Sequence, residues 1–116
     1  MSKYIPWSTV EQLVLVESIE NFNHLLGDLR WKKISEYVIS TLKMIGTVDQ
    51  SRFTEDECFE EWKSITRNYP FPAYPDSSEC IQYIITYLRR KRIDELDKEM
   101  MNMKNKLLQL QKLPSN

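Results

Sequence analysis

The sequence has little of the material that active-site loops and cross-linked folds require. Its 116 residues include two glycines, two cysteines and one histidine. Two glycines leave no Gly-rich phosphate loop, and Cys58 and Cys80 do not have the spacing of metal ligands or a secretory context. No nucleophile–base pair and no paired catalytic carboxylates stand out. We therefore expect a protein that is not an enzyme, that binds no cofactor or metal, and whose thiols stay reduced.

Long apolar runs are missing as well. No stretch approaches the roughly 18 apolar residues that a transmembrane helix needs. The first residues lack the basic-then-apolar order of a signal peptide. With 41% hydrophobic and 28% charged residues, the composition is that of an ordinary soluble chain. We expect one domain with an appended element and no membrane contact.

The remaining pattern predicts an all-α fold. Ser8 and Glu11 fit a capping box at the start of a first helix. Its buried face is predicted from spacings of three and four residues at Leu15, Val16, Ile19, Phe22 and Leu26. Asp28 is the predicted cap of a second helix, which Gly46 ends. Residues 46–53 are predicted to form a loop.

A third helix is expected over residues 54–66, with Thr54 and Glu57 in a second capping box. Its inner face carries Cys58, Trp62 and Ile65, and the second helix contributes Ile34 and Val38. The tryptophans of all three segments, Trp7, Trp31 and Trp62, are predicted to lie in the core. These elements define a first domain over residues 1–69, followed by a Pro-rich connector at 70–77.

The final helix is expected over residues 78–113, too long to pack along its whole length on so small a domain. An apolar stripe at Ile81, Ile84, Ile85 and Leu88 predicts that its first part folds back on the domain. A heptad seam follows, formed by Ile93, Leu96, Met100, Met103, Leu107 and Leu110.

The heptad seam predicts a coiled coil, either a homodimer or a heteromer. With Ile93 at position a of a parallel pair, Arg92 faces Asp97 of the other helix, and Glu99 faces Lys104. Both pairs are opposite in charge. Methionine at a and d positions specifies a partner poorly, so a partner's helix fits the same seam.

Charge is distributed unevenly. Residues 1–76 hold 8 basic and 12 acidic side chains, whereas residues 77–116 hold 8 basic and 5 acidic ones. Residues 55–61 of the third helix hold five carboxylates and no basic side chain: Glu55, Asp56, Glu57, Glu60 and Glu61. Such a helix repels DNA and attracts basic proteins such as histone tails. Favourable placement at the positive end of the helix dipole is the simpler reading of the same charges.

Several motifs together resemble the Myb/SANT family: Trp7-Ser-Thr-x-Glu11, Trp31-x-x-Ile34 and Thr54-x-x-x-Cys58-x-x-x-Trp62. With the long last helix, the chain is similar to the N-terminal region of the bromodomain-containing protein 8 family. That resemblance implies a three-helix SANT-like bundle and a nuclear, non-catalytic subunit of a MYST-type histone acetyltransferase complex. The acidic third helix departs from DNA-reading Myb repeats and matches SANT domains that bind histone tails.

The basic cluster Arg89, Arg90, Lys91 and Arg92 leaves three readings open. It suits a nuclear localisation signal, a phosphate contact, or the charged positions that flank the seam of a coiled coil. A Myb-like DNA-binding protein that uses this cluster with Lys32 and Lys33 is the alternative function. A scaffold without histone contact is the third.

Overall fold

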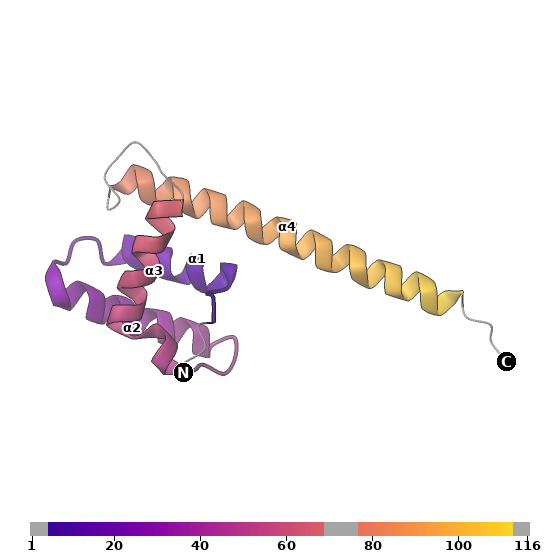
Figure 1. Ribbon diagram of the computed structural model, residues 1–116, viewed down its shortest axis with the longest axis horizontal. Helices are drawn as coiled ribbons and strands as arrows, with labels where there is room; N and C mark the ends of the chain where they lie inside the picture. The colour runs from indigo at the N-terminus through magenta and orange to yellow at the C-terminus, as the bar shows by residue number, and fades with distance from the viewer. Residues whose placement is uncertain (1–4, 69–76, 113–116) are drawn as a thin grey trace.

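The computed structural model describes residues 5–68 and 77–112, and all regular secondary structure in these two ranges is helical, as predicted. The elements are α1 (Thr9–Asn21), α2 (Gly27–Lys43), the 3-10 helix η1 (Gln50–Phe53), α3 (Glu55–Asn68) and α4 (Ser78–Gln111). Helices α1 to α3 pack together with the beginning of α4, and the rest of α4 extends away from them (Figure 1). The longest dimension is consequently 67 Å, against 33 and 28 Å across.

The predicted capping box at the start of α1 is confirmed. Ser8 Oγ accepts from the backbone N–H of Glu11 at 3.1 Å, and the Ser8 N–H donates to Glu11 Oε1 at 2.8 Å. The same carboxylate receives the guanidinium of Arg52, whose Nη1 lies 3.1 Å from Oε2. Glu11 therefore fixes both the beginning of α1 and the position of η1 against it.

The start of α2 differs from the prediction. Gly27 adopts a φ of +64°, and α2 begins there with Leu26 as its N-cap and no side-chain cap bond. The prediction that Asp28 caps this helix is wrong, because Asp28 already lies in its first turn. Leu26 is 87% exposed rather than buried. Helix α1 ends at Asn21, so the helical spacing no longer applies to Leu26.

Residues 46–53 contain more structure than the predicted loop. Asp49 caps η1 by accepting from the backbone N–H of Ser51 at 3.1 Å. Phe53 at its end is only 2% exposed, and its ring meets that of Trp7 edge-on at a centroid distance of 4.9 Å. The buried hydroxyl of Ser35 donates to the Phe53 carbonyl at 2.6 Å. Phe53 thus anchors this segment in the core.

Two of the three tryptophans lie in the core as predicted. Trp7 and Trp62 are buried, whereas Trp31 is partly buried and packs against the edge of the core, so the prediction for Trp31 is confirmed only in part. The inner faces predicted for α2 and α3 are confirmed, because Ile34, Val38, Leu42, Cys58 and Ile65 are buried.

The first part of α4 belongs to the globular unit. Ser77 caps the helix by accepting from the Cys80 N–H at 3.2 Å. The predicted stripe is confirmed, because Ile81, Ile84, Ile85 and Leu88 are all buried, mainly against α1. Each such side chain contributes about 1.5–3 kcal/mol through burial. The predicted connector at 70–77 lies outside the described residues except for Ser77.

Candidate interaction surfaces

The heptad seam is solvent-exposed along its whole length. Its six side chains are 42–64% exposed: Ile93, Leu96, Met100, Met103, Leu107 and Leu110. Met101 and Leu108 beside it are also more than half exposed. No residue of α4 after Leu88 is buried within the described ranges. A row of apolar side chains this long on a projecting helix is typical of a contact with another chain.

A hydrogen bond marks the point at which α4 leaves the globular unit. The hydroxyl of Thr9, which is buried at the start of α1, donates to Glu95 Oε2 at 2.6 Å. This bond holds the pKa of Glu95 below its ordinary value, and the nearby Arg92 and Lys91 charges act in the same direction. The heptad seam begins at Ile93, within one turn of this contact.

The charged side chains beside the seam form pairs within α4 itself. Arg92 Nη1 lies 3.1 Å from Glu95 Oε1 and 3.7 Å from Glu99 Oε1. Arg92 and Glu99 are therefore already paired within α4, although the predicted parallel coil would use both of them across its interface. Such a coil would therefore exchange existing ion pairs for new ones rather than add to them.

Within the basic cluster, the structure places Arg89 and Arg92 beside acidic partners. Arg89 Nη2 lies 3.5 Å from Glu17 Oε1 on α1, so it links α4 to the globular unit. Arg90 and Lys91 are exposed. The cluster thus contributes to the packing of α4 as well as to its surface charge.

Four carboxylates form an exposed acidic surface on α3: Glu55, Asp56, Glu57 and Glu60. Thr54 Oγ1 accepts from the Glu57 N–H at 3.3 Å, as the predicted cap requires. The reciprocal bond of a capping box, from the Thr54 N–H to the Glu57 carboxylate, does not form among the described residues, so only half of the predicted box is present. Glu60 pairs with Lys63 of the next turn at 3.1 Å. The first three carboxylates also lie in the first turn, where the helix dipole stabilises them.

Glu61 does not belong to the acidic surface, although the sequence grouped it there. It is 7% exposed, and its Oε2 accepts from Gln12 Nε2 of α1 at 2.9 Å. Burial raises the pKa of Glu61; the Gln12 hydrogen bond opposes that shift, and the Glu11 charge adds to it. A carboxylate in this position cannot reach a basic peptide in solution.

The acidic surface contains an aromatic pair that sequence reasoning missed. Phe59 is exposed between the carboxylates, and Trp31 of α2 meets its ring edge-on at 5.1 Å. The Lys63 ammonium lies 4.9 Å from the Phe59 ring centroid. Phe59 follows Glu55 by four residues, and residues four apart lie on the same face of a helix. This spacing was the signal in the sequence that could have placed Phe59 among the carboxylates.

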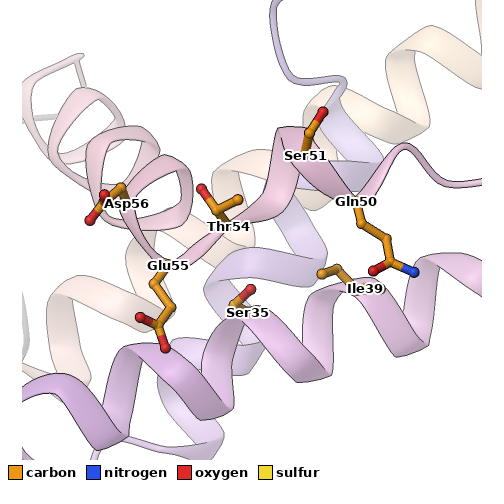
Figure 2. A pocket seen from close by; sticks show the side chains of 7 residues that line it. All are labelled: Ser35, Ile39, Gln50, Ser51, Thr54, Glu55 and Asp56. Carbon is orange, nitrogen blue, oxygen red and sulfur yellow. The ribbon is translucent and has the colours of Figure 1, made fainter.

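A shallow cavity of about 530 Å³ adjoins the beginning of α3. Figure 2 shows Glu55 pointing toward α2 at this cavity, whereas Asp56 lies farther from α2. Its lining residues are Ser35, Ile39, Gln50, Ser51, Thr54, Glu55 and Asp56. The Ser35 hydroxyl is already engaged with the Phe53 carbonyl, so the cavity presents little beyond the acidic residues already described.

The two described ranges contain no group of three or more histidine, cysteine or acidic side chains able to hold a metal ion, and no helix in them is long and apolar enough to cross a membrane. What the geometry defines is an all-α protein with a small globular unit and a projecting helix. Comparison with protein-family models, curated proteins and solved structures gives no match.

Proposed function

We propose that this protein is a non-catalytic interaction module that assembles with other chains through α4. The observation that carries the proposal is the exposed heptad seam on a helix that leaves its own globular unit near Glu95. Exposed apolar rows of this length on a monomer are typical of contact surfaces.

We place this module in chromatin, as a nuclear subunit of a histone acetyltransferase complex. This step rests on the Myb/SANT-like motifs around Trp7, Trp31 and Trp62 and on the resemblance to the bromodomain-containing protein 8 family. The acidic surface of α3 supports it, because four exposed carboxylates attract a basic histone tail or a basic partner subunit. The same charges disfavour DNA binding by α3.

A titration of a basic histone-tail peptide tests the role of α3. Each exposed ion pair is worth roughly 0.2–1 kcal/mol, so binding should be weak and should fall as salt rises. The double variant Glu57→Gln/Glu60→Gln should weaken peptide binding several-fold.

The matched control is Asp28→Asn/Glu36→Gln, which removes the same charge from α2 and should bind like the unmodified chain. Equal binding by both double variants would contradict a role for the acidic surface. Duplex DNA that binds more tightly than the peptide would favour the Myb-like alternative instead.

A further inference from the structure

The charges of α4 are segregated along the heptad seam. Residues 93–99 carry four acidic side chains and one basic side chain, whereas residues 100–112 carry three lysines and no acidic side chain. Two copies that lie parallel place net charges of the same sign side by side over both halves, and only the Arg92–Asp97 and Glu99–Lys104 contacts oppose that repulsion. They attract when they lie antiparallel, because each acidic half meets a basic half.

The apolar layers also match in the antiparallel arrangement. When the seam of one copy is reversed against another, Ile93 meets Leu110, Leu96 meets Leu107, and Met100 meets Met103. The flexible methionines then fill the centre, and branched side chains close both ends.

Flanking charges agree with the same register. Asp97 of one copy lies beside Lys104 of the other, and Glu99 lies beside Lys106. Within the described ranges, Asp97, Lys104 and Lys106 form no ion pair of their own, so only the Glu99 contact competes with an existing pair, the 3.7 Å one to Arg92.

The globular unit leaves the seam accessible to a second helix. At about 100° per residue, the centre of the seam lies roughly 90° around α4 from Leu88, which is buried where α4 packs on α1. A helix that docks on the seam therefore approaches beside the globular unit. Figure 1 shows that this part of α4 extends well beyond α1 to α3.

We propose that a second copy of this chain packs antiparallel along the seam from Ile93 to Leu110 and places the two globular units at opposite ends. The inference rests on the proposed role of α4 in assembly. It is independent of the acidic surface on α3.

Disulfide trapping with the full chain tests the arrangement. Ile93 and Leu110 of one helix are about 25 Å apart, so only residues that meet across the interface can be linked. An affinity-tagged Ile93→Cys chain mixed with an untagged Leu110→Cys chain should give a mixed disulfide dimer in a glutathione buffer. The control Lys98→Cys, on the outer face of α4, should give none. Cys58 and Cys80 are buried and should not compete.

A charge exchange provides a second readout. Asp97→Lys should lower the dimer fraction in sedimentation, because it places lysine beside Lys104 of the other copy. Adding Lys104→Asp should restore the dimer in an antiparallel pair. In a parallel pair the same double variant would set like charges against Arg92 and Glu99 and weaken the dimer further.

An Ile93–Ile93 disulfide, failure of the exchange to restore the dimer, or a monomeric unmodified chain would each overturn the antiparallel proposal. A monomer that still binds the basic peptide would leave the proposed function standing, with another protein's helix on the seam.

Discussion

Thr9 and Glu95 are 86 residues apart in sequence, yet the Thr9 hydroxyl donates a 2.6 Å hydrogen bond to the Glu95 carboxylate. The bond joins the first residue of α1 to α4 just where the heptad seam begins. Because α4 is one continuous helix, the direction of the whole projecting segment depends on how its first part is fixed to α1. Thr9 and Glu95 form the last described contact in that attachment.

The first prediction concerns this bond. Thr9→Val keeps the shape of the buried side chain and removes the donor, so the free energy of unfolding at pH 7 should fall by about 1 kcal/mol. The pKa of Glu95 is held low in the folded state, so the contribution is present above the unfolded pKa and is lost as pH falls through the folded value. Urea unfolding should therefore show a smaller difference at pH 3.

The matched control for this prediction is Thr86→Val. Thr86 lies on the exposed side of α4, and among the residues that the structure describes its hydroxyl bonds only to the Gln82 carbonyl one turn earlier. This control should unfold like the unmodified chain. Equal losses in the two variants would show that the Thr9–Glu95 bond contributes nothing specific.

The second prediction concerns Glu61. Burial raises its pKa, so the folded state binds the proton more tightly than the unfolded chain, and stability is lost as pH rises through the folded pKa. Glu61→Gln removes the buried charge. It also offers an N–H to Gln12 Oε1, a buried atom without a partner in the described ranges. The free energy of unfolding should rise by about 1 kcal/mol at pH 7.

The extra free energy of unfolding in Glu61→Gln should become smaller toward pH 4, because Glu61 of the unmodified chain is then protonated as well. Glu60→Gln, one residue away on the exposed side, is the control and should change stability little at either pH. A Glu61→Gln variant less stable than the unmodified chain at pH 7 would contradict the assigned cost of the buried carboxylate.

The third prediction compares the two glycines. Gly27 has a φ of +64°, and alanine in that region costs roughly 1–2 kcal/mol, although a Cβ there would meet no atom within 4 Å. Gly46 has the same open surroundings without the positive φ. In urea unfolding, Gly27→Ala should be destabilised by about 1 kcal/mol and Gly46→Ala should be neutral or slightly stabilised. Equal behaviour would rule out backbone strain as the reason for glycine at position 27.

The sequence predicted the elements whose signals are local. The capping box at Ser8 and the stripe from Ile81 to Leu88 depend on residues within one or two turns, and both are confirmed. The acidic surface was placed correctly on α3 except for Glu61. The carboxyl of Glu61 lies among the charged residues in sequence but faces α1 in space, and only the packing of α3 on α1 reveals this.

Other features depend on backbone geometry or distant contacts. The left-handed φ of Gly27 moves the start of α2 ahead of Asp28, and Phe53 is buried because Trp7 and Ser35 meet it from other segments. Trp31 is a large apolar residue on a helix, so its partly buried position at the edge of the core beside Phe59 could not be distinguished from a fully buried one. The SANT-like arrangement and the coiled coil stay predictions.

Sedimentation equilibrium of the full chain at tens of micromolar, with and without Leu107→Asp, tests the central claim that the heptad seam is a contact surface between copies. We predict a dimer for the unmodified chain and a monomer for the variant, with unchanged helical content because Leu107 contacts no core residue. An unmodified chain that sediments as a monomer, or a Leu107→Asp chain that remains a dimer, would contradict it.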